Sequence, residues 1–234
     1  MTEKLHDLNK MLKDMTPTES IPFVLKNVEG IKVFSTSFGI EDQLITHFLN
    51  PYASQVRVFT LDTGRHFNET YEVFQRTQNK YPLLKIITYF PEPADIVTYV
   101  NEFGINGFYD HIDRRKECCR IRKVKPLQKA LEGVSLWITG LRAGQSQSRQ
   151  ELEFLEWDKV NKLIKFNPLM NFTLNEVELL TEAYNVPINT LYKKGYLSVG
   201  CAPCTRALAP GEDFRAGRWW WEHSEKECGL HQSK

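Results

Sequence analysis

The sequence has few of the features that direct a chain to a membrane, to secretion or to nucleic acid. Residues 1–7 contain no apolar run, so we expect neither a signal peptide nor a membrane span. The 234 residues carry a net charge of +1, which leaves no general excess of cations for nonspecific binding of nucleic acid. Any anion site must therefore be built locally, from a few cations that the fold brings together.

Cysteine is also scarce, with only five in the chain. An odd number of clustered cysteines argues against the disulfide framework of a secreted protein, so we expect a location in the reducing cytoplasm. The chain has no internal repeat and no low-complexity linker. Its 41% hydrophobic and 12% aromatic residues suffice for one core. We therefore expect a single domain over residues 1–222 and a polar, mobile tail over residues 223–234.

Four of the five cysteines form two close pairs, Cys118 with Cys119 and Cys201 with Cys204. Four thiolates can hold a [4Fe–4S] cluster or a zinc ion. Adjacent side chains leave a helix about 100° apart, which suits separate corners of a cluster better than one tetrahedral ion. The arginines beside the first pair, and Lys123, would stabilise thiolates and a bound anion. A zinc site, and four thiols that bind nothing, stay open as alternatives.

Apolar runs and helical periodicity alternate along most of the chain. We expect helices over residues 40–50, 68–80 and from the first cysteine pair to 131, a loop over 104–117, and a helix that begins at the capping box Thr173–Glu176. The expected strands cover residues 31–36, 56–61, 84–89, 135–140 and 162–166. This alternation predicts an α/β fold with a Rossmann-like, doubly wound, mainly parallel sheet.

Three stretches at the ends of predicted strands contain the small, hydroxyl-bearing and cationic side chains that bind anions. They cover residues 35–42, 62–66 and 140–149, at the sheet edge where α/β proteins bind ligands. Arg215 and Arg218 follow the second cysteine pair, and arginine forks match phosphate and sulfate oxygens. From the residues alone, these stretches could equally be ordinary turns and solvated charge.

Three of the motifs resemble those of one family. They are Cys-Cys-Arg-Ile-Arg-Lys at residues 118–123, Gly-Cys-Ala-Pro-Cys-Thr-Arg at 200–206 and Glu-Cys-Gly-Leu-His at 227–231. Together they resemble the assimilatory adenylylsulfate (APS) reductases, the iron–sulfur type of the phosphoadenylylsulfate (PAPS) reductase family. The resemblance extends from about residue 35 to residue 231, and it implies a PP-loop-like fold of the adenine nucleotide alpha-hydrolase type.

The resemblance also implies an activity. It is the thioredoxin-dependent reduction of APS to sulfite and AMP in sulfate assimilation and cysteine biosynthesis. The Cys228 thiolate would attack the sulfur of the bound substrate and form an S-sulfocysteine. Thioredoxin, or a similar dithiol protein, would then release sulfite from that adduct.

The residues that the resemblance assigns fall into three groups. Those implied in catalysis are Cys228, Lys123 and His231. The one [4Fe–4S] cluster per chain would be held by Cys118, Cys119, Cys201 and Cys204. The residues implied in substrate binding are Ser35, Ser37, Gly39, Asp42, Asp62, Thr63, Arg149, Arg215 and Arg218.

Other functions stay open at this point. A dual APS and PAPS reductase fits the same motifs, as does a zinc-stabilised nucleotide-binding module without catalysis. A PP-loop tRNA sulfurtransferase would need the loop Ser-Gly-Gly-x-Asp-Ser and a basic face, and the sequence shows neither. We expect no nucleic acid and no membrane partner, and the sequence leaves the formation of homo-oligomers open.

Overall fold

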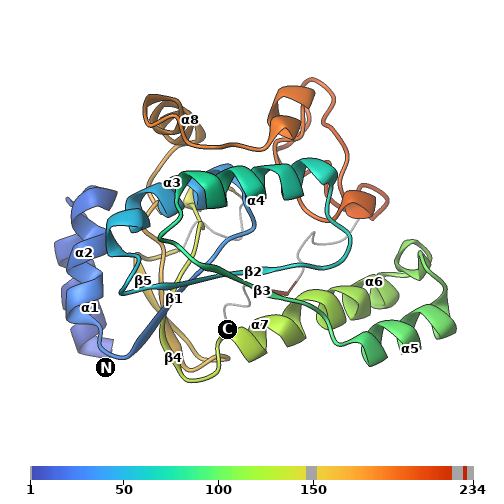
Figure 1. The fold of residues 1–234 in the computed structure, drawn as a ribbon, viewed down its shortest axis with the longest axis horizontal. Coiled ribbons are helices and arrows are strands. Elements are labelled where there is room, and N and C mark those ends of the chain that lie inside the picture. The colour runs from blue at the N-terminus through green and yellow to red at the C-terminus, as the bar shows by residue number, and fades with distance from the viewer. Residues whose placement is uncertain (1, 146–151, 223–228, 231–234) are drawn as a thin grey trace.

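The computed structural model describes residues 2–145, 152–222 and 229–230. Within them, a six-stranded sheet has the strand order β3-β2-β1-β4-β6-β5 (Figure 1). All neighbouring strands are parallel except β5 and β6, which pair antiparallel at one edge. The strands are β1 (Ile31–Ser35), β2 (Arg57–Leu61), β3 (Ile86–Tyr89), β4 (Val134–Ile138), β5 (Leu155–Asp158) and β6 (Leu163–Phe166). The predicted fold class is therefore confirmed.

Helices cover both faces of this sheet, with α3 and α4 on one side and α6 and α7 on the other (Figure 1). The helices are α1 (Thr2–Leu12), α2 (Pro17–Asn27), α3 (Ile40–Leu49), α4 (Asn68–Lys80), α5 (Pro93–Phe103), α6 (Ile112–Cys119), α7 (Lys125–Ala130) and α8 (Leu174–Ala183). None of the helices in the described part of the chain has both the length and the apolar character needed to cross a membrane.

Side-chain alternation along the strands divides the core into two layers. Phe34 and Ile138 pack on the face that carries α1, α2, α3 and α8, whereas their neighbours Val33 and Trp137 pack with Leu127 of α7 on the other. Successive strand residues point to opposite faces, so each buried strand supplies both layers. The sheet is covered on both sides, and its open positions are the loops at the strand ends.

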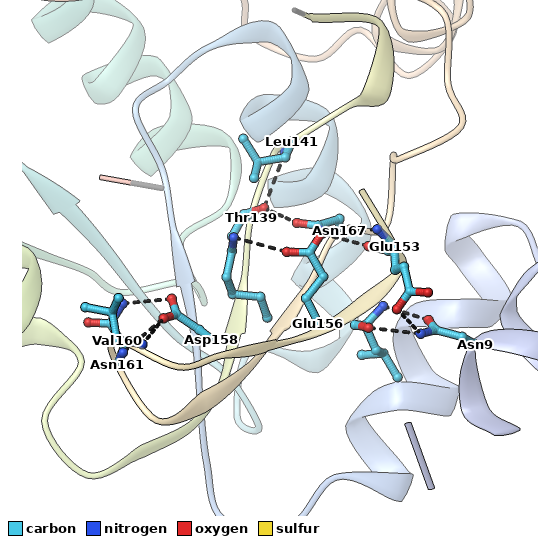
Figure 2. A network of polar contacts seen from close by, with 11 residues as sticks. Asn9, Thr139, Leu141, Glu153, Glu156, Asp158, Val160, Asn161 and Asn167 are labelled. Atoms are coloured by element: carbon cyan, nitrogen blue, oxygen red, sulfur yellow. Dashed lines mark hydrogen bonds and ion pairs between the residues drawn. The ribbon is translucent and has the colours of Figure 1, made fainter. Parts of the chain in front are cut away.

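Polar contacts fix the antiparallel edge and the end of β4 (Figure 2). Thr139 donates to Asn167 Oδ1 over 2.6 Å, and Asn167 Nδ2 donates to the Glu153 carbonyl over 2.8 Å. Asn9 of α1 exchanges hydrogen bonds with the backbone of Leu155, which binds β5 to the N-terminal helix. These bonds hold in place the strand end from which residues 140–145 enter the site.

The observed secondary structure departs from the prediction in several places, including helix α5, which was not predicted. Residues 112–117 are not loop but most of α6, so the cysteine pair ends a helix instead of beginning one. The segment has little apolar periodicity, and its N-cap is His111, whose ring accepts from Asp113 N over 3.2 Å. The prediction also had no strand at β5, which is short and half polar. The capping box at Thr173 and Glu176 is confirmed.

The helix predicted from the cysteine pair to residue 131 is interrupted. A π-helical turn, Arg120–Val124, separates α6 from α7. Such turns contain one more residue than an α-helical turn and occur often at functional sites. Here the turn follows Cys119 directly and contains Lys123.

Candidate active site

A cavity of about 230 Å³ lies at the carboxyl ends of the central strands. This is the edge where α/β sheets bind ligands, because the loops after neighbouring strands meet there. The β1–α3 loop, the β2–α4 loop and the segment after β4 each supply part of the wall. Of the residues predicted to bind substrate or act in catalysis, the cavity is lined by Ser35, Ser37, Gly39, Asp42, Thr63, Lys123, Arg215 and Arg218.

The β1–α3 loop uses its own polar groups internally. Asp42 accepts from the Ser37 backbone N–H over 2.6 Å and from its hydroxyl over 2.7 Å. The first N–H of α3, at Ile40, donates to the phenol oxygen of Tyr192 over 2.9 Å. Phe38 holds the loop in place, with φ of 60° and its ring stacked on Phe74. Donors of the loop that were expected to bind an anion are thus already bonded to protein atoms.

The same wall of the cavity carries buried carboxylates. Burial raises the pKa of Asp42 to about 6, although the hydrogen bonds from Ser37 act to lower it. Its neighbour Glu41 accepts from Arg142 over 2.8 Å and from Gln145 over 3.0 Å. This part of the cavity therefore suits hydrogen-bond donors of a ligand better than its anionic groups.

Three cations also line the cavity: Lys123, Arg215 and Arg218. Arg218 is 7% exposed, and its guanidinium carbon lies 4.8 Å from the ring centre of Trp219. A Cβ on Gly200 would collide with that guanidinium, so only glycine leaves it room. Its protein acceptors, Ser198 Oγ and the Val199 carbonyl, are distant at 3.4 Å. This arrangement leaves the guanidinium able to bind an anionic ligand strongly.

Two predicted residues of the β2–α4 loop have different positions. Thr63 lines the cavity, and its hydroxyl contacts Cys201 Sγ over 3.3 Å. Asp62 does not line it; its Oδ1 accepts from Gly64 N over 2.8 Å and from the Tyr71 hydroxyl over 3.0 Å. Asp62 therefore shapes the turn that presents Thr63.

The two cysteine pairs meet in a second, small cavity of about 20 Å³. One pair ends α6, and the other brackets the short 3₁₀ turn Ala202–Cys204. All four thiols are free of disulfides. Phe108 and Trp219 pack against them, and arginines line the same cavity. Among the described residues, no three His, Cys, Asp or Glu side chains have an arrangement suited to a single metal ion.

The environments of these thiols differ. Burial raises the pKa of Cys204 to about 12 and also raises the pKa of Cys118. At Cys201 burial acts in the same direction, but Lys123, the Thr63 hydroxyl and two arginines outweigh it and lower the pKa. The cations beside Cys201 thus favour its thiolate, whereas burial favours the protonated thiols of Cys118 and Cys204.

The two cavities share a wall. Lys123 lines both of them, and Arg122 donates to the Thr63 carbonyl over 2.6 Å. Sequence reasoning placed Arg122 beside the thiols but did not find its bond to the Thr63 carbonyl. It also did not find the contribution of Tyr192, which lies outside every motif. It also missed the hydrogen bond of 2.8 Å from Trp137 to Ser35 Oγ. No local pattern marks these contacts, because each joins segments far apart in the chain. Arg149, Cys228 and His231 lie outside the described residues.

Fold and cavity together define an α/β protein with a mostly parallel sheet and a cavity at the carboxyl ends of its central strands. The family model of the phosphoadenosine phosphosulfate reductase domain matches residues 31–207. The chain therefore belongs to the PAPS reductase family and is an oxidoreductase acting on a sulfur group. The resemblance of the motifs to the PAPS reductase family is confirmed.

Relatives in this family are close. The adenosine 5′-phosphosulfate reductase of Rhizobium meliloti is 49% identical over 89% of this chain and 78% of its own length. That of Allochromatium vinosum is 46% identical over 94% of this chain and 86% of its own length. A phosphate complex of PAPS reductase from Candida auris, 25% identical, superimposes with a TM-score of 0.76 over 88% of this chain and 98% of that one. FMN adenylyltransferase from Candida glabrata, 14% identical, covers 99% of this chain and 78% of that one with a TM-score of 0.56, which reflects the fold alone.

Gly140→Ala tests the close approach of the β4 end to Asp42. The added Cβ would collide with the Asp42 carboxylate, so that side chain must move and weaken its bonds with Ser37. We expect urea unfolding to show that the free energy of unfolding is lower than in the wild type by about 1–3 kcal/mol, which is typical of overpacking. Gly144→Ala is the matched control, because its Cβ would meet Arg142 at an ordinary 3.7 Å. Equal stability of the two variants would contradict this role.

The raised pKa of Asp42 predicts a pH dependence of stability. A carboxyl group whose pKa rises from 3.8 to about 6 on folding binds protons more readily in the folded state. Its contribution to stability is therefore lost as the pH rises from about 4 to 6. Over this pH range, the free energy of unfolding of the wild type should fall relative to that of Asp42→Asn. The expected fall is about 1.4 kcal/mol for each unit by which the pKa is raised. Chemical unfolding at several pH values measures the difference, and parallel curves would show an ordinary Asp42 pKa.

Proposed function

We propose that this chain reduces APS to sulfite and AMP, with thioredoxin or a similar dithiol protein as the reductant. The observation that carries the proposal is the polarity of the cavity. Its cations Lys123, Arg215 and Arg218 suit a phosphosulfate, and its carboxylates Glu41 and Asp42 suit the hydrogen-bond donors of a nucleoside. The relatives named adenosine 5′-phosphosulfate reductase support APS as the substrate.

In the proposed first step, the Cys228 thiolate attacks the sulfur of the sulfate group. A sulfur–sulfur bond forms, and the bond from that sulfur to the phosphate oxygen breaks. AMP leaves with the electron pair, and Cys228 becomes an S-sulfocysteine. Arg215, Arg218 and Lys123 stabilise the negative charge that collects on the leaving phosphate. His231 lies near the nucleophile in sequence and is proposed to assist it.

In the second step, a thiolate of the reductant attacks the sulfur of Cys228. Sulfite leaves with the electron pair of the sulfur–sulfur bond, and a mixed disulfide remains. The second thiol of the reductant resolves it, which returns Cys228 as a thiol and leaves the reductant as a disulfide. The reductant thus supplies both electrons, and no other redox group is needed.

The proposed substrate contacts extend from the cations to the loops at the strand ends. Ser35, Ser37, Gly39, Asp42 and Thr63 would contact the nucleoside part. Asp62 would act through the turn that presents Thr63, and Arg149 would contact the nucleotide anion. The catalytic domain is proposed to span residues 1–222, with a tail over 223–234 that carries the nucleophile, in a cytoplasmic enzyme of sulfate assimilation and cysteine biosynthesis.

Cys118, Cys119, Cys201 and Cys204 are proposed to hold one [4Fe–4S] cluster. Their shared cavity, their free thiols and the cations around them support this assignment. When bound, the cluster supplies a covalent link between α6 and the 202–204 turn and a fixed charge beside the substrate cations. Lys123, which lines both cavities, would be held by this charge in position for the substrate.

The decisive experiment uses the anaerobically purified protein with APS or PAPS, with and without thioredoxin. We expect sulfite only with the reductant, and a higher kcat/KM for APS than for PAPS. Without reductant, APS should release one AMP per active site and leave a sulfonate on the Cys228 peptide, as mass spectrometry can show. Cys228→Ser should form neither adduct nor sulfite, because a hydroxyl is far less ionised than a thiol. Turnover by Cys228→Ser, or a preference for PAPS, would contradict the scheme.

The cluster assignment predicts a loss of iron on removal of one ligand. The wild type should be brown and contain four irons and four sulfides per chain. Cys204→Ser should contain less iron and unfold at lower denaturant, because metal binding and folding are coupled. Cys228→Ser is the matched control and should keep its iron. Colourless wild type with one zinc per chain would support the zinc alternative.

A further inference from the structure

Ser35 brings a hydroxyl group to a side of the cavity that it shares with apolar residues. It ends β1 and lies two residues after Val33, so both side chains point to the sheet face that carries α7. Three apolar side chains of that face, Leu61, Leu127 and Trp137, line the cavity together with Ser35. A hydrogen bond from this hydroxyl to a ligand would therefore be partly shielded from water, where its direction matters more.

The hydrogen bond from Trp137 fixes the direction in which this hydroxyl can act. Trp137 Nε1 donates to Ser35 Oγ over 2.8 Å. An indole nitrogen has a proton but no free lone pair, so this bond cannot run the other way. Within the described residues, Ser35 makes no hydrogen bond as a donor. Its hydroxyl proton is therefore available to an acceptor in the cavity.

Ser37, the next serine of the same segment, is oriented in the opposite way. Its hydroxyl donates to Asp42 Oδ2 over 2.7 Å, which uses its single proton within the protein. Both serines line the cavity. Ser35 thus offers a proton to a ligand, whereas Ser37 offers lone pairs.

The indole that orients Ser35 is itself held in place by the sheet. Trp137 is 1% exposed and lies on β4, in register with Val33 of β1. The Lys165 ammonium is 5.9 Å from its ring centre and pairs with Glu156 over 3.3 Å. A side chain that is packed on a strand is held more precisely than one on a loop. The orientation of the Ser35 hydroxyl therefore follows from the packing of the sheet.

We propose that Trp137 is a positioning residue, whose hydrogen bond holds the Ser35 hydroxyl as a donor to an acceptor atom of the nucleotide. A group that is already oriented loses less freedom when the ligand binds than one that must first turn towards it. Once Ser35 donates to the ligand, its oxygen becomes a better acceptor, so the two hydrogen bonds strengthen each other. The identity of the ligand rests on the proposed function, whereas the bond from Trp137 is independent of it.

The first test is a double-mutant cycle on the anaerobically purified holoenzyme, with AMP as the probe and titration calorimetry as the measurement. Ser35→Ala should weaken AMP binding about fivefold and Trp137→Phe about threefold, as expected for one neutral hydrogen bond and its support. The double variant should bind AMP about as weakly as Ser35→Ala, because Trp137 acts through Ser35. Trp157→Phe, the same change at an exposed tryptophan of β5, is the control and should bind AMP as the wild type does.

The second test does not depend on the folding of a Trp137 variant. In wild-type protein with nitrogen-15 in its tryptophans, the Trp137 indole resonance is identified as the one that Ser35→Ala shifts most. AMP should move the proton of this resonance downfield, because the Ser35 oxygen accepts more strongly once its own proton is donated. The indole resonance of Trp157 should stay in place.

The outcomes separate this inference from the proposed function. Effects that multiply in the double variant would show that Trp137 and Ser35 act separately, which overturns the inference whether or not the enzyme makes sulfite. A Trp137 resonance that does not move when AMP is bound would overturn it as well. A non-additive cycle in a protein that makes no sulfite from APS would support the inference and overturn the proposed reaction instead.

Discussion

Burial of positive charge is the constraint on which this structure depends. Five cationic side chains of the described residues are buried: Arg115, Arg122, Arg142, Lys165 and Arg218. Three of them bind carboxylates, at Glu222, Glu41 and Glu156. Arg122 donates to a carbonyl, and Arg218 has a tryptophan ring beside it and two long contacts. A buried cation is costly without an anion, so the incomplete pairing is concentrated where a ligand can supply one.

The same constraint relates the two cavities. Trp219 packs among the cysteines and has Arg218 and Arg115 each 4.8 Å from its ring centre. Arg115 is neutralised by Glu222, whereas Arg218 reaches the substrate cavity. One aromatic side chain thus fixes a cation of the substrate site and a cation of the fold. Lys123 and Thr63 also contact residues of both cavities. A structural change in the cysteine cavity should therefore alter the larger cavity through several short contacts.

The sequence allowed the parallel sheet to be predicted, because β1, β2 and β4 are apolar runs between periodic helices. It also indicated which cavity residues would meet, since the loops after parallel strands share one edge. It failed at α6, whose polar composition hides its period, and at the role of Asp62, which depends on a hydrogen bond from Tyr71. The sequence also could not show that the first N–H of α3 is already bonded within the protein, because its acceptor, Tyr192, comes from a distant segment with no motif.

The π-helical turn at Arg120–Val124 limits how the length of the chain can vary. Surface loops accept inserted or deleted residues, because the elements that they join keep their own orientation. A regular helix does not accept such changes, since each added or lost residue rotates the remainder of the helix by about 100°. Loss of one residue here would restore a regular helix and change the position of Lys123 relative to the two cysteines. The number of residues between the cysteine pair and Lys123 is thus fixed by the structure. This segment can tolerate substitutions, but a deletion would change the position of the lysine relative to the thiols.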